Sequence, residues 1–262
     1  MFHWRQLAMS LLLALALPAQ AALEAGHPTV LITGANRGIG LEFVRQFAER
    51  GWNVIATARK PERADELNAL AASHPRVVVE PLDVTDHPAI EALGRKYADQ
   101  PIDILLSNAA ITPRYKSAFK RVKGVDFDMA RRSYEVNALG PLKMAQVFMP
   151  QVEASQQKKI IAMSSKAGSF ALGPKMPMMY SYRASKAALN MLMYTLSFET
   201  AKKGVTVTLL SPGTVNTTPG FKMPQGISPE ESVRKMLKVI DSITPANNGQ
   251  FLNYENGEVI PW

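Results

Sequence analysis

Two residues suited to proton transfer, Tyr182 and Lys186, stand four positions apart in the segment Tyr-Arg-Ala-Ser-Lys. Residues at this spacing lie on the same face of a helix, so both side chains can enter one cleft. A tyrosine phenol ordinarily has a pKa of about 10. A neighbouring ammonium lowers that pKa, which suits a group that gives or takes a proton near neutral pH. Such a pair is also common on surface helices, so the surrounding residues must decide between the two interpretations.

A glycine-rich segment near the start of the chain is a candidate phosphate-binding loop. It reads Thr33-Gly34-Ala35-Asn36-Arg37-Gly38-Ile39-Gly40 and follows an apolar, β-branched run. Glycines let the backbone turn tightly and approach a pyrophosphate, while the following helix directs its free N–H groups at the anion. A lone glycine-rich string is weak evidence, but its place between a first strand and a helix strengthens it. We therefore expect cofactor contacts from Gly34, Asn36, Arg37, Gly38, Ile39 and Gly40.

Short β-branched runs alternate with helical periods along the rest of the chain. The expected strands are Thr29–Thr33, Asn53–Thr57, Val77–Leu82, Ile102–Ser107, Lys159–Ser164, Val205–Leu210 and Gln250–Asn253. The expected helices include Ile39–Arg50, Ala89–Tyr97, Phe127–Gln151 and Tyr182–Lys202. This alternation predicts βαβ units with right-handed crossovers. The sequence thus indicates an α/β fold, a single doubly wound Rossmann-type domain over residues 27–262, with a parallel, roughly seven-stranded sheet flanked by helices.

The end of the second expected strand bears on the choice of dinucleotide. Proteins that prefer NAD usually carry an acidic residue there to bind the ribose 2′-hydroxyl. This strand ends in Ala-Thr-Ala followed by Arg59, with no acid in place. Arg59, together with Arg37 of the glycine-rich loop, offers guanidinium groups that bind a phosphate through paired hydrogen bonds. We therefore expect NADP(H) as the cofactor.

The spacing T-G-x-x-x-G-x-G resembles that of the short-chain dehydrogenase/reductase family, and the resemblance extends over residues 29–262. Asp83 and Val84 resemble the pair at a strand end whose acid reaches the adenine. Asn108-Ala109-Ala110 resembles the family's turn after the fourth strand and departs from it at Ala110, where the family has glycine. The resemblance implies that all five residues contact the cofactor.

The resemblance also implies a catalytic group. Ser165, after the fifth expected strand, matches the serine that hydrogen-bonds the substrate carbonyl, and Asn137 matches a helix asparagine that supports a water-mediated relay to the lysine. The implied catalytic residues are Asn137, Ser165, Tyr182 and Lys186. Tyr182 and Lys186 are also expected to contact the cofactor, as are Pro212, Gly213, Val215 and Thr217 after the sixth strand.

Three stretches resemble the branch of C-factor and sniffer-type carbonyl reductases. They are Tyr182–Met191, Glu230–Val233 with its following helix, and the C-terminal part Asn253–Gly257 with the ending Ile260-Pro261-Trp262. The branch implies reduction of a ketone or aldehyde, with hydride from NADPH and a proton from Tyr182. The alternative is a signalling or regulatory protein of C-factor type that binds NADP(H) without significant physiological turnover. After Thr217 the sequence departs from the branch, so its substrate specificity does not carry over.

Charge and composition limit the other possibilities. The chain has no cysteine, which excludes disulfides and thiolate metal sites, and no two of its four histidines stand at metal-ligand spacing, so we expect no metal. The net charge is +8, but the basic residues are mostly dispersed and we expect no nucleic-acid partner. The densest basic group is Arg114, Lys116, Lys120, Arg121 and Lys123. It is either a solvated connecting segment or a patch that attracts anionic substrates.

The substrate and the oligomeric state are less directly indicated. Met-rich surfaces adapt to varied apolar ligands. The segment from Pro174 to Met179, together with Phe221 and Met223, therefore suggests a medium-sized apolar ketone or aldehyde, or the corresponding alcohol. These methionines can equally pack beneath a loop or against another subunit. The family resemblance implies a homo-oligomer.

Residues 1–22 have the pattern of a signal peptide or hydrophobic leader. Arg5 precedes an apolar run from Leu7 to Leu17, and Ala19-Gln20-Ala21 gives a cleavage pattern. This indicates export to the periplasm or beyond, or a peripheral membrane contact. If the start codon is misassigned, the protein is instead expected to be cytoplasmic, where the nicotinamide cofactor pool lies.

Overall fold

The computed structural model describes residues 23–112, 118–218, 220 and 222–262. The expected leader at 1–22 lies outside the described residues, as do Arg114, Lys116 and Phe221. Among the described residues no helix is long and apolar enough to cross a membrane.

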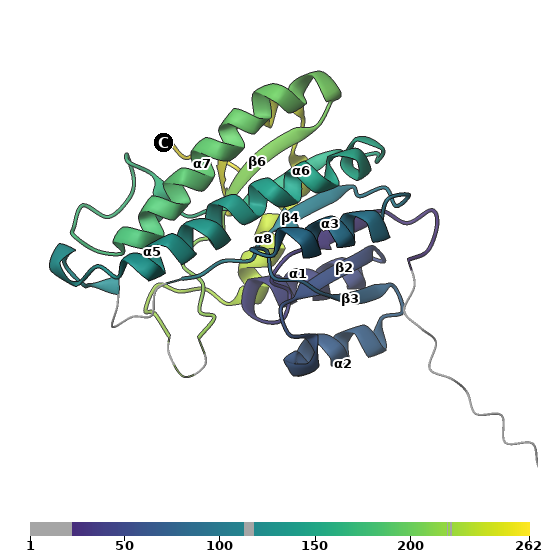
Figure 1. The fold of residues 1–262 in the computed structure, drawn as a ribbon, viewed down its shortest axis with the longest axis horizontal. Coiled ribbons are helices and arrows are strands. Elements are labelled where there is room, and N and C mark those ends of the chain that lie inside the picture. Colours follow the sequence, from purple (N-terminus) through teal and green to yellow (C-terminus); the bar gives the residue numbers. More distant parts are fainter. Residues whose placement is uncertain (1–22, 113–117, 219, 221) are drawn as a thin grey trace, which may run out of the picture.

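A parallel sheet forms the centre of the molecule (Figure 1). Within the described residues it has seven strands in the order β3-β2-β1-β4-β5-β6-β7. Their bounds are β1 Thr29–Ile32, β2 Asn53–Ala58, β3 Val77–Pro81, β4 Ile104–Ser107, β5 Lys159–Met163, β6 Thr206–Ser211 and β7 Phe251–Asn253. Leu31 of β1 pairs with Ile55 on one side and Leu105 on the other. The chain first builds the sheet outward from β1 to β3 and then in the other direction from β4 to β7, which confirms the doubly wound fold.

Helices cover both faces of this sheet. They are α1 Gly38–Glu49, α2 Asp65–Ser73, α3 His87–Lys96, α5 Phe127–Tyr134, α6 Gly140–Glu153, α7 Tyr180–Thr200 and α8 Pro229–Ser242. Side chains alternate along β1, so Val30 and Ile32 pack with α1, α2 and α8, whereas Leu31 packs with α3, α6 and α7. Phe47 on the first face and Phe148 on the second are fully buried. The two apolar layers fix the sheet between the helices, as the continuous apolar strands predicted.

The expected helix Phe127–Gln151 is interrupted, so that prediction was wrong in its continuity. A π-helical turn, Glu135–Leu139, separates α5 from α6. Pro141 follows this turn and has no N–H to donate to the carbonyl four residues back, that of Asn137. The wider turn accommodates this missing hydrogen bond, and such turns are frequent at functional sites. In α3, by contrast, the helix begins at His87 with Asp86 as its cap, so Asp83 lies outside it.

The buried carboxylate of Asp103 ties the amino ends of three strands together. It accepts hydrogen bonds from the main-chain N–H groups of Thr29 at 2.9 Å and of Gln156 and Gln157 at 3.2 Å. Thr29 begins β1, and the two glutamines precede β5. The Asp103 carboxylate thus supplies the hydrogen-bond acceptor that these three main-chain N–H groups need.

We expect Asp103→Ala to lower the free energy of unfolding by about 3 kcal/mol, because it leaves several buried donors without an acceptor. Equilibrium urea unfolding measures the change. Asp99→Ala, at an exposed position nearby, is the matched control and should shift stability by less than about 0.5 kcal/mol. Equal effects of the two substitutions would contradict this role for Asp103.

Candidate functional site

The glycine-rich loop is fixed by the turn that follows β4. The hydroxyl of Thr33 accepts hydrogen bonds from the N–H groups of Asn108 at 3.0 Å and Ala109 at 3.1 Å. The Asn108 amide in turn donates to the carbonyls of Thr33 and Gly34. The structure therefore brings together two segments that the sequence placed separately at the cofactor, because β1 and β4 are neighbours in the sheet.

The glycines of this loop are required by close approaches. Gly34 has a φ of +68°, and a Cβ there would lie 2.8 Å from the Cα of Ala109. A Cβ at Gly40 would lie 2.2 Å from the carbonyl oxygen of Gly34. Gly38 packs against Thr217, which brings the loop after β6 over the start of α1. Arg37, the cap residue of α1, makes no side-chain capping bond, so the first N–H groups of the helix are available to an anion.

Arg37 and Arg59 lie on the same side of the sheet as this loop. Both side chains are exposed, and neither forms an ion pair within the described residues. Arg59 directly follows β2, and the strand itself ends without an acidic residue. The loop, the free helix start and the two guanidinium groups fit a dinucleotide that carries a 2′-phosphate.

Asp83 is held by partners that the sequence did not indicate. One carboxylate oxygen accepts from the N–H and the hydroxyl of Thr85, at 3.0 and 2.8 Å, and the other accepts from Arg132 at 3.2 Å. Burial raises the pKa of Asp83, but the Thr85 hydrogen bonds and the charges of Arg132 and Arg59 outweigh it and lower the pKa overall. Asp83 therefore presents a charged oxygen with acceptor capacity left on the Arg132 side, which fits an amino group of the adenine. Val84 packs on Gly140, beside the π-helical turn.

Lys186 and Tyr182 share one face of α7, as their spacing predicted. The Lys186 side chain is only 3% exposed, and its ammonium donates to the Met163 carbonyl at the end of β5 over 2.7 Å. The ammonium lies 5.9 Å from the centre of the Tyr182 ring. Burial lowers the pKa of Lys186 to about 8. Burial raises the pKa of Tyr182, and a hydrogen bond with the Ser165 side chain opposes that rise.

Asn137 lies in the π-helical turn and is fully buried. Its amide oxygen accepts from the Ile111 N–H at 2.7 Å, and its amide nitrogen donates to the Ile111 carbonyl and to the Ser185 hydroxyl, both at 3.0 Å. The Ser185 hydroxyl donates to the Tyr182 carbonyl. The asparagine side chain thus binds the loop after β4 and the neighbour of Lys186, not Lys186 itself, and its part in a proton relay stays a prediction.

The segment after Ser165 is anchored from two sides. The Ser165 hydroxyl accepts from the Ala167 N–H at 3.1 Å, and Arg183 of α7 donates to the Ala167 carbonyl at 3.3 Å. On the far side the C-terminus closes over it, because Ser169 donates to the Pro261 carbonyl at 2.6 Å and Ala171 donates to the Trp262 carbonyl at 3.0 Å. The C-terminal residues singled out by the sequence therefore help to hold the segment that leads from Ser165 to Tyr182.

Sequence reasoning missed Ser185, Arg132 and Thr33. Ser185 lies inside the Tyr-Arg-Ala-Ser-Lys segment, so its place on the helix beside Tyr182 was a usable signal. Arg132 gave no such signal, because its contact with Asp83 spans 49 residues of sequence.

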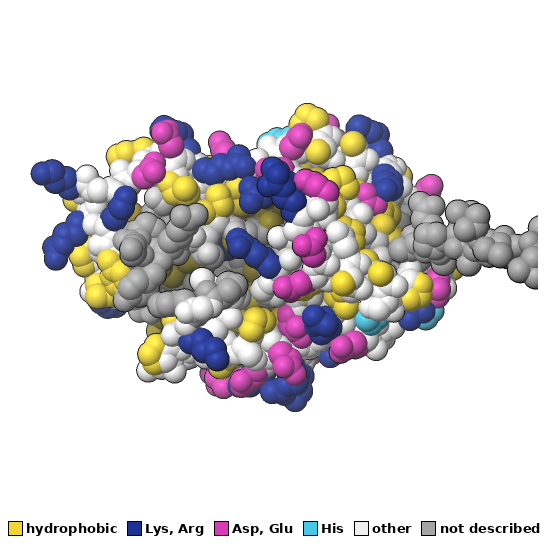
Figure 2. All heavy atoms as spheres, turned by 90° about the horizontal axis from the view of Figure 1, so that it is seen from below, with side chains coloured by type: hydrophobic (Ala, Val, Ile, Leu, Met, Phe, Trp, Pro, Cys, Tyr) yellow, Lys and Arg dark blue, Asp and Glu magenta, His cyan; other side chains and the backbone are white. Residues whose placement is uncertain are grey.

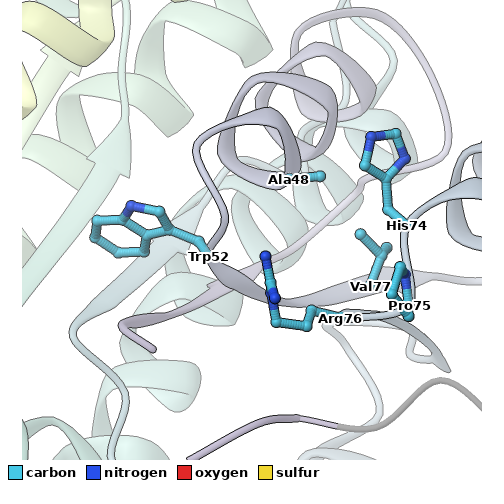
Figure 3. A pocket seen from close by; sticks show the side chains of 6 residues that line it. All are labelled: Ala48, Trp52, His74, Pro75, Arg76 and Val77. Carbon is cyan, nitrogen blue, oxygen red and sulfur yellow. The ribbon is translucent and has the colours of Figure 1, made fainter. Parts of the chain in front are cut away.

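The surface of the described structure has two small pockets, and neither is lined by Ser165, Tyr182 or Lys186. Figure 3 shows the first, a hollow of about 30 Å³ lined by Ala48, Trp52 and the residues from His74 to Val77. It lies where the edge strand β3 begins, away from β5 and Lys186, and has room for about one water molecule. The second, lined by Thr85, His87, Arg132, Glu135 and Leu139, adjoins the partners of Asp83. Across the described part of the chain, no group of three or more His, Asp or Glu side chains is arranged to hold a metal ion.

The lowered pKa of Lys186 predicts how stability depends on pH. The unfolded chain keeps this proton up to about pH 10, whereas the folded chain releases it near pH 8. Between these values the unfolded chain binds more protons, so the free energy of unfolding rises with pH. In Lys186→Met this contribution is absent. We expect urea unfolding from pH 7.5 to 9.5 to show wild type gaining stability relative to the variant; parallel profiles would contradict the shift.

Comparison with known proteins agrees with this geometry. A family model described as short chain dehydrogenase matches residues 28–225. An uncharacterized oxidoreductase of Schizosaccharomyces pombe is 35% identical over 251 residues, which cover 88% of this chain and 96% of the relative. The 1-hydroxy-2-glutathionyl-2-methyl-3-butene dehydrogenase of Rhodococcus is 33% identical and covers 89% of this chain and 99% of its own. The C-signal protein of Myxococcus xanthus is 34% identical over 66% of this chain and all of its own length.

Solved structures show the same likeness. The NADPH-bound carbonyl reductase from chicken fatty liver is similar with a TM-score of 0.79 and 34% identity, covering 90% of this chain and 99% of its own. The carbonyl reductase Sniffer of D. melanogaster is similar with a TM-score of 0.81 and 28% identity, covering 90% and 100%. The resemblance inferred from the sequence is thereby confirmed. This chain belongs to the short-chain dehydrogenase family.

Proposed function

We propose that the protein is an NADPH-dependent reductase that converts a ketone or aldehyde to an alcohol. The observation that carries the proposal is the contact set of Ser165, Tyr182 and Lys186. A hydroxyl and a phenol that hydrogen-bond each other stand beside a buried ammonium at the end of β5. The similarity to carbonyl reductases described as NADPH-bound or in complex with NADP supports the same reaction class.

Each residue of the set has a distinct role in this proposal. The bound cofactor supplies the hydride. Ser165 holds the substrate oxygen by hydrogen bonding and stabilises its developing negative charge. Tyr182 donates the proton to that oxygen, and the charge of Lys186 makes the phenol a better acid. Asn137 keeps the loop after β4 and the start of α7 in register. The reverse oxidation of an alcohol uses the same groups.

A signalling or regulatory role is the second candidate, and the similarity to the C-signal protein favours it. In that reading the chain binds NADP(H) without significant turnover in the cell. The intact Ser165, Tyr182 and Lys186 set argues for turnover, because a binding protein needs none of these groups to transfer a proton.

The first test follows oxidation of NADPH with a panel of aldehydes and ketones. Wild type should turn over, and Tyr182→Phe should lower kcat by about 100- to 10,000-fold, because the proton donor is lost. Tyr180→Phe is the matched control, since Tyr180 is an exposed tyrosine two positions earlier in α7. If no carbonyl is reduced while NADPH still binds tightly, the signalling candidate replaces the reductase.

A second test addresses the cofactor. Arg37→Ala with Arg59→Ala should raise the KM for NADPH by about 10- to 100-fold, since charge-assisted hydrogen bonds to a 2′-phosphate are lost. The KM for NADH should change little, and Arg63→Ala, an exposed arginine after Arg59, should change neither. An enzyme that prefers NADH would keep the reductase but overturn the roles of Arg37 and Arg59.

A further inference from the structure

Acidic residues are absent from the loops that leave the carboxyl ends of β4, β5 and β6. The chain has no Asp or Glu between Asp103 and Asp126, and between Glu153 and Glu230 it has only Glu199. Elsewhere acids and bases are mixed, and the net charge of the whole chain is only +8. The loops around the catalytic group are therefore selectively basic.

Cations of these loops are exposed and carry no acidic partner. Lys120, Arg121 and Lys123 follow β4, Lys166 and Lys175 follow β5, and Lys222 follows β6. Within the described residues none of the six forms an ion pair, whereas Lys96, Lys143, Lys203 and Lys235 on other parts of the surface do. On the underside of the molecule in Figure 2, dark blue side chains lie in the middle, with magenta acidic side chains beside them, and others lie at the left end, which carries α5 in Figure 1.

Contacts bring these basic loops to the catalytic group. Lys166 directly follows Ser165, whose hydroxyl bonds Tyr182. The N–H of Met179, just before α7, donates to the Ala118 carbonyl at 2.7 Å, which places the Lys120 to Lys123 segment next to the start of the helix. The cations thus border the place where a substrate must reach Ser165 and Tyr182.

Arg183 adds a charge that the protein does not neutralise. It follows Tyr182 in α7 and is half-buried. Its guanidinium donates to the carbonyls of Ala167 and Met176, both at 3.3 Å, and meets no acidic side chain in the described structure. A guanidinium that is hydrogen-bonded only to carbonyl groups keeps its full positive charge and raises the electrostatic potential of its surroundings.

The cofactor does not account for this charge. Its phosphates have their own binding groups in the segment from Gly34 to Gly40 and in Arg37 and Arg59, on the β1 and β2 side of the sheet. The basic loops lie instead after β4, β5 and β6. The remaining anion to be bound is the substrate.

We propose that the carbonyl substrate carries an anionic group such as a carboxylate, and that Lys120, Lys123 and Lys166 select for it. The methionines between Pro174 and Tyr180 then contact an apolar body that joins the anionic group to the carbonyl. This inference rests on the proposed reductase function and names the substrate class of that site.

Paired probes test the inference on the full protein: 4-carboxybenzaldehyde, which is anionic, and methyl 4-formylbenzoate, its neutral ester. At saturating NADPH, kcat/KM for the carboxylate should exceed that for the ester by about tenfold, the effect of about 1.4 kcal/mol from nearby charges. The ratio should fall towards one in Lys120→Gln/Lys123→Gln/Lys166→Gln and at high ionic strength. The control is Arg95→Gln/Lys202→Gln/Lys238→Gln, which removes the same charge from exposed sites elsewhere and should keep the wild-type ratio.

The results of these assays distinguish the anionic-substrate inference from the reductase proposal. If the ester is reduced as well as the carboxylate, or if both triple variants change the ratio equally, the inference is overturned and the reductase stands. If neither aldehyde is reduced, the reductase fails, and calorimetric binding of the two aldehydes to the NADP⁺-bound protein decides. Tighter binding of the carboxylate that is lost only in the Lys120, Lys123 and Lys166 variant supports the anionic site, and equal binding overturns it.

Discussion

The buried amide of Asn137 is the contact on which the candidate site most depends. It pairs with both main-chain groups of Ile111 and with the hydroxyl of Ser185, whose own proton goes to the Tyr182 carbonyl. Three segments that are far apart in sequence are thus held by one side chain without solvent. Losing any one of these partners would leave a buried polar group unpaired, at a cost of about 1–3 kcal/mol. Asn137 therefore links the loop after β4 to the turn of α7 that carries Tyr182.

The hydrogen bonds of Asn137 with Ile111 and Ser185 are made from an irregular, π-helical turn. A continuous α-helix from Phe127 to Gln151 would need a hydrogen bond from the main-chain nitrogen of residue 141 to the Asn137 carbonyl. Pro141 has no N–H and cannot donate it. Gly140 then allows Val84 to pack directly against the turn, since a Cβ there would lie 3.0 Å from the Val84 side chain. The loop that carries Asp83 and the turn that carries Asn137 consequently meet.

The sequence predicted the parts of this arrangement that local patterns encode. Alternating apolar runs predicted the sheet and most of its helices. The glycines of the first loop predicted a tight turn before α1, and the Tyr182–Lys186 spacing predicted that the two side chains share one face of α7. The sequence gave no bounds for α2, whose nine residues have only Leu67 and Leu70 buried and hence a weak pattern. It also missed the turn at Asn137 and the Arg132–Asp83 contact, because both depend on which side chains meet after the sheet has formed. Propensity and spacing do not contain that information.

Two buried lysines differ in whether an acidic side chain compensates their charge. Lys159 begins β5 and donates to the Ile240 carbonyl at 2.8 Å. Burial lowers its pKa, and the charges of Asp241 and Asp103 oppose that shift. Lys186 also donates to one carbonyl, yet no acid opposes its desolvation and its pKa falls to about 8. A buried charge without a counter-ion is unfavourable for folding, and such groups gather where a ligand or a reacting atom completes them. The loops after β4, β5 and β6, which contain no acidic residue, likewise carry cations without an acidic partner in the described structure. Lys186 in the core and the exposed cations of these loops therefore share one property: in the described structure neither has an acidic partner.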